Sequence, residues 1–135
     1  MKIKSLLMLL IVFLFLAGCA TTATVQLRDK AGSGKYLTDE KGMTLYYFKN
    51  DLDGQSTCID NCVKRWPVFY RDIVTAPAGL NANDFSTMSR IDGHQQTLYR
   101  GRPLYYWYYD KQPGDMKGEG INKAWNVIYP HKFKP

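Results

Sequence analysis

Two related copies of one segment lie within the chain, and this duplication limits the fold more than any other feature. A shift of 59 residues places nine residues of 42–70 on identical residues of 101–129, without an insertion. Further upstream, Gly34 falls on Gly93. A unit repeated at a fixed distance is typical of tandem architectures, and a unit this small buries little core alone. We therefore expect the two copies to fold together as one domain. The matching positions in copy one are Gly42, Leu45, Tyr46, Tyr47, Asp51, Lys64, Trp66, Val68 and Tyr70.

Within each copy, the residue pattern favours short β-strands separated by glycine-containing turns. The predicted fold is all-β, with two tandem pseudo-symmetric repeats of short antiparallel strands, about eight in all, packed face to face or sheet to sheet. A helical turn is expected around Cys58–Lys64. The expected strands are 35–39, 43–48 and 66–70 in copy one, with the first two forming a hairpin, and 85–91, 96–100, 104–109 and 125–129 in copy two.

The segment LYYWYYD (104–110) contains five consecutive aromatic residues. In a strand, neighbouring side chains point to opposite faces, so Tyr105 and Trp107 are expected on one face and Tyr106 on the other. These three have a large aromatic residue at the matching place in copy one, which indicates a structural role. Tyr108 and Tyr109 replace Lys49 and Asn50 of copy one, so we expect them to form either an exposed binding surface or a larger local core.

The N-terminus has the pattern of an export signal. Lys2 and Lys4 precede an apolar stretch at 5–17, which is short for a membrane-spanning helix. Leu16-Ala17-Gly18-Cys19 resembles the bacterial lipobox, which implies cleavage before Cys19 and lipidation of that residue; the alternative is a transmembrane helix with an incidental cysteine. The expected organisation is a signal peptide (1–18), a lipidated cysteine with tether or first strand (19–33), repeat one (24–70), a connector (71–82), repeat two (83–129) and a basic tail (130–135).

The charge of the chain indicates which partners it suits. The formal net charge of +6 becomes +4 when Lys2 and Lys4 are removed with the signal peptide. Such a mild excess suits anionic lipid headgroups or acidic polymers, and nucleic acid is not an expected partner. The expected location is the cell envelope, held at the membrane through the lipid anchor. In a Gram-negative host the outer membrane is favoured, since Thr21 rather than Asp lies two residues after Cys19.

Cys58 and Cys62 remain as an even pair when Cys19 carries lipid. In an oxidising compartment such a pair favours a disulfide. On one helical turn their α-carbons lie roughly 6 Å apart, within the range a disulfide tolerates. The alternative is a redox-active or metal-binding thiol pair. The spacing differs from the Cys-x-x-Cys of thioredoxin-like centres.

The motif Tyr-x(4)-Asp occurs in both copies, as Tyr46 to Asp51 and as Tyr105 to Asp110. With the cysteine pair and the following Trp66-Pro67, it resembles the secreted-repeat lipoproteins, a family whose biochemical role is unassigned. The resemblance covers nearly all of the chain after the signal peptide and implies export and a tandem architecture, but no activity. Copy two departs from the fuller pattern: Lys117 and Ile121 replace the cysteines, and Asn126 replaces the proline.

Other candidate chemistry is weaker. The segment 50–54 resembles the start of a calcium loop but lacks the closing glutamate, so we expect Asp51 and Asp110 to accept backbone N–H groups in turns instead. His94 and His131 with Met43, Met88 or Met116 are weak candidates for a metal site, and neither a metal nor a cofactor is expected. No nucleophile motif or phosphate-binding loop occurs, so catalysis is not expected.

Two functions from different classes follow from these features. The first is a non-catalytic binding or structural module of the cell envelope, whose partner is an envelope protein or a cell-wall glycan. The second is a periplasmic redox or metal-handling module that uses Cys58, Cys62 and His94.

Overall fold

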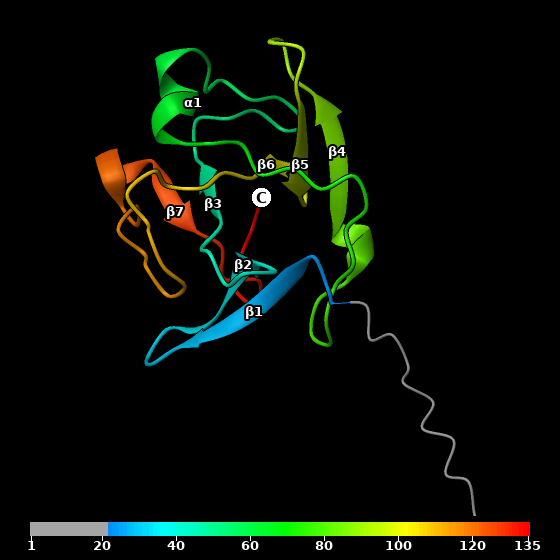
Figure 1. The fold of residues 1–135 in the computed structure, drawn as a ribbon, viewed down its shortest axis with the longest axis vertical. Helices are drawn as coiled ribbons and strands as arrows, with labels where there is room; N and C mark the ends of the chain where they lie inside the picture. Colours follow the sequence, from blue (N-terminus) through cyan, green and yellow to red (C-terminus); the bar gives the residue numbers. More distant parts are fainter. Residues whose placement is uncertain (1–21) are drawn as a thin grey trace, which may run out of the picture.

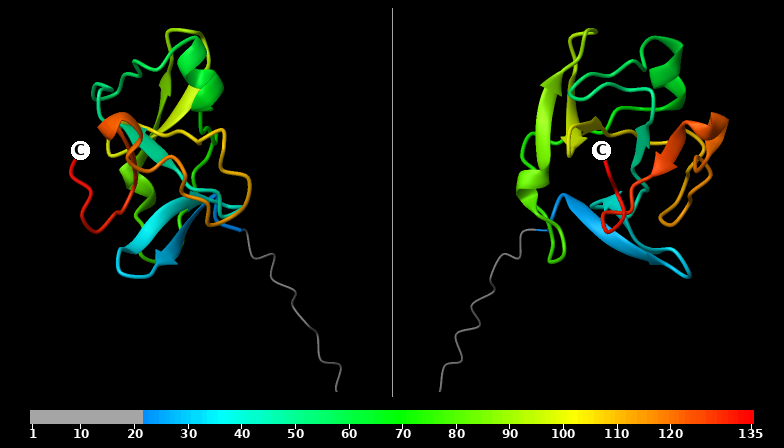
Figure 2. Two further views of the ribbon diagram at one scale, coloured as in Figure 1. Left: turned by 90° about the vertical axis from the view of Figure 1, so that its left-hand side faces the viewer. Right: turned by 180° about the vertical axis from the view of Figure 1, so that it is seen from behind.

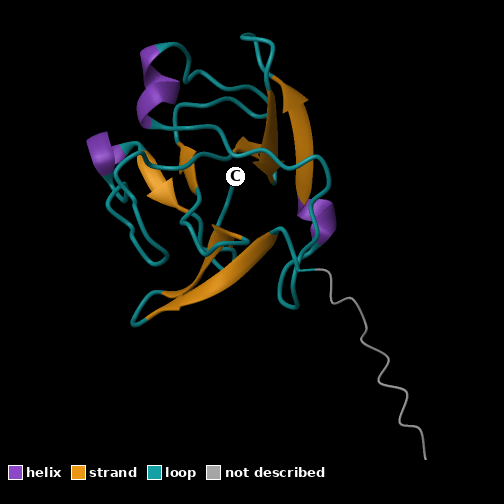
Figure 3. Cartoon of the chain, viewed as in Figure 1, coloured by secondary structure: helices purple, strands orange, loops and turns teal. Residues whose placement is uncertain are grey.

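The computed structural model describes residues 22–135, so the expected signal peptide and Cys19 lie outside the described residues. Every ladder between the strands is antiparallel, and the helical elements are short, so the fold is all-β (Figure 3). No helix within residues 22–135 has the length and apolar character that a membrane span requires. The elements are β1 (Val25–Lys30), β2 (Gly34–Asp39), β3 (Tyr46–Phe48), α1 (Asn61–Arg65), η1 (Ala82–Asp84), β4 (Phe85–Ser89), β5 (Gln95–Tyr99), β6 (Arg102–Pro103), η2 (Ile121–Lys123) and β7 (Trp125–Val127).

Each copy begins with a hairpin. In copy one β1 pairs with β2, and in copy two β4 pairs with β5, which continues into β6 (Figure 1). The pairing within the two hairpins shows that the 59-residue shift does not hold for the whole of each copy. It fails before the second turn, which follows β2 in copy one and β5 in copy two. Val25 pairs with Asp39, and Phe85 pairs with Tyr99, so these segments are related by 60 residues rather than 59. Gly34 therefore corresponds to His94, not to Gly93, because copy one has one more residue in its second turn.

At the centre of the molecule, strand segments of one copy pair with strand segments of the other. β3 of copy one pairs with β7 of copy two, with Tyr46 opposite Val127 (Figure 1). The reciprocal pairing joins Tyr105 of copy two to Val68 of copy one. Each copy's last segment thus lies against the other copy's middle segment.

The reciprocity extends to individual backbone hydrogen bonds. Lys49 N donates to Ala124 O at 2.8 Å, and its counterpart Tyr108 N donates to Arg65 O at 2.8 Å. Tyr46 and Tyr105 exchange both of their backbone hydrogen bonds, at 2.9 and 3.0 Å. These matched contacts define a local pseudo-twofold axis that passes between Tyr46 and Tyr105.

Two apolar clusters fill the opposite faces of this central exchange. Leu45 and Leu104 belong to the first cluster, whereas Tyr46 and Tyr105 belong to the second. The next residues alternate in the same way: Tyr106 packs against the first cluster and Trp107 against the second, as strand periodicity predicted for 104–107. The core is therefore shared by the two copies.

Two predicted strands are reduced to isolated bridges. Within 66–70 only Val68 forms a β-bridge, because Pro67 lacks the N–H that a ladder needs. Within 104–109 only Tyr105 forms bridges, and it forms one with Tyr46 and another with Val68. The part of the chain that the structure describes has seven strands where about eight were expected.

The hairpin expected from 35–39 and 43–48 is also only partly formed. Thr38 bridges Thr44 across the turn, but β2 pairs mainly with β1, and β3 begins at Tyr46 to pair with β7. The helical turn expected at 58–64 is displaced slightly, since α1 spans Asn61–Arg65.

Candidate functional site

The two Tyr-x(4)-Asp motifs are joined to each other rather than closed within each copy. The Tyr46 hydroxyl donates to Asp110 Oδ2 at 2.5 Å, and the Tyr105 hydroxyl donates to Asp51 Oδ2 at 2.6 Å. All four side chains are buried. The two motifs thus join the copies through a reciprocal pair of hydrogen bonds.

The second carboxylate oxygen of each motif aspartate accepts a backbone N–H from the loop that follows it. Asp51 Oδ1 accepts from Thr57 N at 2.7 Å, and Asp110 Oδ1 accepts from Lys117 N at 2.9 Å. Burial and then the hydrogen bond to Asp110 raise the pKa of Tyr46 above its ordinary value. Burial also raises the pKa of Asp51, although its hydrogen bonds from Thr57 and Tyr105 oppose that shift. Both aspartates therefore accept a backbone N–H as expected, but from the loop beyond the strand-ending turn rather than from the turn itself.

Three tryptophans and one phenylalanine form a continuous aromatic stack along the same face. The rings of Trp66 and Trp125, equivalent in the two copies, are parallel within 4° and lie 3.7 Å apart. Phe48 lies against Trp125 at 4.3 Å, and its counterpart Trp107 lies against Trp66 at 4.2 Å. The stack therefore has the same reciprocal order as the backbone contacts.

Tyr108 and Tyr109 continue from the Trp107 end of this stack to the surface. They are 52% and 57% exposed, at the positions where copy one has the exposed Lys49 and Asn50. Tyr109 lies edge-on to Trp107 at 5.4 Å, and Lys111 Nζ lies 4.0 Å from the centre of the Tyr108 ring. Tyr106, by contrast, donates its hydroxyl to Asp39 at 2.8 Å and belongs to the interior.

Cys58 and Cys62 form a disulfide, with their α-carbons 5.2 Å apart. Cys58 is 1% exposed, and both cysteines pack with the apolar cluster that contains Trp66. Within residues 22–135, no group of three or more His, Cys, Asp or Glu side chains could hold a metal ion. His94 lies in the exposed turn of the β4–β5 hairpin, where its backbone N–H donates to Asp92, and His131 lies beside Gly34.

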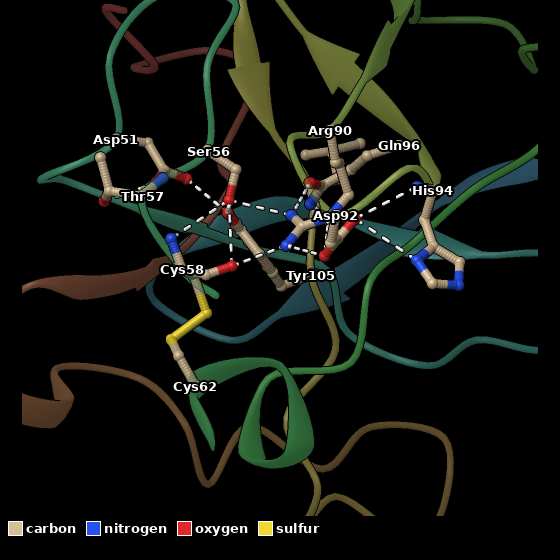
Figure 4. A network of polar contacts seen from close by, with 11 residues as sticks. Asp51, Ser56, Thr57, Cys58, Cys62, Arg90, Asp92, His94, Gln96 and Tyr105 are labelled. Atoms are coloured by element: carbon tan, nitrogen blue, oxygen red, sulfur yellow. Dashed lines mark hydrogen bonds and ion pairs between the residues drawn. A yellow bond between two sulfur atoms is a disulfide. The ribbon is translucent and has the colours of Figure 1, made fainter. Parts of the chain in front are cut away.

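A buried arginine that no sequence pattern indicated, Arg90, lies beside the disulfide (Figure 4). The Arg90 guanidinium donates to Ser56 Oγ at 2.9 Å, to Gln96 Oε1 at 2.6 Å and to the Cys58 carbonyl at 2.7 Å. It also forms an ion pair with Asp92 at 2.9 Å, and these bonds lower the pKa of Asp92 to about 2. The corresponding residue in copy one is the exposed Lys30, so no repeated pattern pointed to Arg90.

The Arg90 network borders a groove of about 610 Å³. Val63, Val68 and Tyr70 form its apolar side, whereas Asp92 and His94 lie at its polar rim. The guanidinium of Arg90 and the carboxylate of Asp92 are already bonded to each other and to neighbouring groups, so the network serves to fix the hairpin against the disulfide loop.

Fold and site together define a tandem-repeat β domain whose two copies complete each other through exchanged strands and exchanged Tyr–Asp bonds. The family described as a secreted repeat of unknown function matches this chain twice, at residues 28–70 and 86–129. The protein therefore belongs to that family, and the two matches follow the two copies seen in the structure. No curated protein and no solved structure matched the chain.

Proposed function

We propose that the protein is an exported, lipid-anchored and non-catalytic binding module of the cell envelope. The observation that carries this proposal is the exposure of Tyr108 and Tyr109, side by side with ring centres 5.1 Å apart. An exposed tyrosine presents a flat apolar face and a hydroxyl while losing little conformational entropy on contact. The equivalent positions of copy one are the polar Lys49 and Asn50, so the shared fold does not require aromatic residues there.

An anchor at Cys19 would orient this aromatic surface. β1 starts at Val25, six residues after Cys19, and a fully extended chain of that length spans at most about 20 Å. β1 lies at the end of the molecule opposite α1 (Figures 1 and 2). Tyr108 is fixed to the α1 end, because its N–H donates to Arg65 O. A lipid at Cys19 would thus hold β1 close to the membrane, with α1 and the backbone of Tyr108 farther from it.

Replacement of Cys19 tests the anchor. The Cys19→Ser variant should either leave the membrane fraction or accumulate with its signal peptide uncleaved, whereas the native chain should sediment with membranes and with the outer membrane in a Gram-negative host. Normal processing and membrane fractionation of the variant would show that Cys19 is not the anchor.

Replacement of the exposed tyrosines tests the binding role. Full-length protein purified in detergent should sediment with delipidated envelopes, and Tyr108→Ser or Tyr109→Ser should reduce that fraction. Lys49→Ser is the matched control, because Lys49 occupies the same place in copy one. Equal sedimentation of all the variants would contradict a binding role for the two tyrosines.

A further inference from the structure

A separate groove of about 460 Å³ lies between α1 and η2, beside the aromatic stack. Phe48, Trp66 and Trp125 form its aromatic side. The polar side chains around it come from four exposed residues: Asn50, Asn61, Arg65 and Asn122. The groove is therefore lined by aromatic rings, three carboxamides and one guanidinium.

This combination of groups fits a sugar better than a charged small molecule. A carboxamide both donates and accepts hydrogen bonds, as do the hydroxyl and acetamido groups of an amino sugar. Trp66 and Trp125 are 4% and 3% exposed, so the half-buried ring of Phe48 supplies most of the apolar surface that the C–H face of a sugar ring could contact. A few placed polar groups around an apolar surface give a site its specificity. None of the described residues that line the groove carries a carboxylate, so the pair of acids used to hydrolyse glycosidic bonds is not among them.

Unfavourable backbone conformations are concentrated at this groove. Among residues 22–135, four non-glycine residues have positive φ, and three of them adjoin the groove: Asp60, Asn122 and Lys123 at 52°, 52° and 54°. Such conformations cost free energy for residues with a Cβ, and they often occur where a side chain must be held in a particular place. Here Asp60 directly precedes Asn61 of α1, and Asn122 itself lies on η2, so these conformations help to place two of the carboxamides that line the groove.

The walls of the groove are held rigidly. The parallel contact of Trp66 with Trp125 fixes the aromatic side. Cys62 also lines the groove, and its disulfide with Cys58 fixes the start of α1, next to Asn61. A site that is already ordered loses less conformational entropy when it binds a ligand.

The groove is connected to the exposed tyrosines. Arg65 contributes to the groove, and its carbonyl accepts the N–H of Tyr108. Tyr109 contacts Trp107, at the opposite end of the stack from Phe48. Sugar units that extend past Arg65 would therefore reach Tyr108 first and then Tyr109, whose ring centre lies 5.1 Å from that of Tyr108.

We infer that the groove between α1 and η2 binds an oligosaccharide bearing acetamido groups, with Asn61, Arg65 and Asn122 as its hydrogen-bonding residues and Tyr109 as a flanking contact. This inference rests on the proposed function, because it names the ligand class of the same aromatic surface. It also gives the disulfide a role, which is to fix one wall of the binding groove.

The test is titration of the full-length protein in detergent with the β-1,4-linked tetramer of N-acetylglucosamine. All three tryptophans of the chain belong to the stack, so their fluorescence should change in a saturable way. Asn122→Gly removes one carboxamide while keeping a residue that tolerates positive φ. It should weaken binding about tenfold, the loss expected for one good hydrogen bond. Arg65→Ala should have an effect of similar size.

Asn83→Ala is the matched control, because Asn83 is an exposed asparagine on the other 3-10 turn, η1. Tetramer binding that is weakened by Asn122→Gly and unchanged by Asn83→Ala supports the inference. Absence of saturable binding, or equal binding by the Asn122→Gly and native proteins, would overturn it. If binding to delipidated envelopes still depends on Tyr108 in that case, the proposed function stands and only the ligand class is wrong.

Discussion

Tyr46 and Tyr105 meet across the pseudo-twofold axis, and each donates its backbone N–H to the carbonyl of the other. Their side chains then reach into opposite copies, where they bind Asp110 and Asp51. The shared motif thus works between the copies, and this arrangement leads to the first two predictions.

Removal of either motif hydroxyl should destabilise the fold. Tyr46→Phe leaves a buried oxygen of Asp110 without its donor, and Tyr105→Phe does the same to Asp51. Each variant should lose about 1–3 kcal/mol of unfolding free energy, the cost of an unsatisfied buried polar group. Urea denaturation followed by tryptophan fluorescence measures the loss. Tyr70→Phe, which removes only an exposed bond to Asp72, should change stability by less than about 0.5 kcal/mol. Similar losses of unfolding free energy in all three variants would mean that the two Tyr–Asp hydrogen bonds between the copies do not stabilise the fold.

The stacked tryptophans should be indispensable to both copies. Trp66→Ala or Trp125→Ala should each remove about 3–5 kcal/mol, out of a total of about 5–15 kcal/mol for a domain of this kind. Near-UV circular dichroism with thermal melting provides the measurement, and Ile73→Ala, at a 72% exposed position, is the control. A separately expressed 24–70 fragment should lack native-like signal. Independent cooperative melting of that fragment would contradict a shared core.

The aromatic run 104–110 should divide into structural and surface residues. Tyr106→Ala and Trp107→Ala should damage folding, since Tyr106 binds Asp39 and Trp107 stacks on Trp66. Tyr108→Ser and Tyr109→Ser should keep stability within about 1 kcal/mol of the native value. Thermal melts of the four variants decide this without any ligand. If the last two collapse like the first two, the whole run is core.

The disulfide should be inert and modestly stabilising. A loop this short contributes about 2 kcal/mol by the chain-entropy argument, so the Cys58→Ser, Cys62→Ser double variant should remain folded. Thiol labelling of the exported protein should find no free pair at 58 and 62. A pair that titrates reversibly near physiological potential would instead support the redox or metal-handling function.

The Arg90–Asp92 ion pair should make stability dependent on pH in the acid range. The pKa of Asp92 in the folded protein, about 2, lies below its ordinary value of 3.8. The stabilisation by the ionised carboxylate is therefore complete above about pH 4 and is lost as the pH falls toward about 2. The Asp92→Asn variant lacks this carboxylate, so its unfolding free energy should fall less than that of the native protein between about pH 4 and about pH 2. Equal pH slopes for native and variant proteins would mean that Asp92 does not supply this dependence.

Much of the architecture was predictable because the chain repeats itself. The comparison of Tyr108 and Tyr109 with Lys49 and Asn50 left two alternatives, an exposed surface or a larger local core, and in the structure both side chains are exposed. The alternation of 104–107 predicted which face each side chain takes. Spacing and compartment predicted the disulfide. Each of these properties depends on residues near one another in sequence or on a direct comparison of the copies.

The exchange between copies was not predictable in the same way. Periodicity identifies Tyr46–Phe48 as a strand, but it carries no information about a partner as distant as Trp125–Val127. Arg90 gave no signal, because Lys30 of copy one is exposed and a lone arginine normally lies at the surface. The one-residue difference between the second turns also concealed the true alignment of the two hairpins.

The crossed pairing of β3 with β7 also bears on how such a chain arises. A polypeptide with one copy alone would have a middle strand and a motif tyrosine whose partners both belong to another copy. It could satisfy them only by binding a second identical chain, through a contact in which the same surface serves both partners. The pseudo-twofold axis between Tyr46 and Tyr105 has the geometry of such a homodimer, and the connector at 71–82 makes its two halves a permanent pair at any concentration.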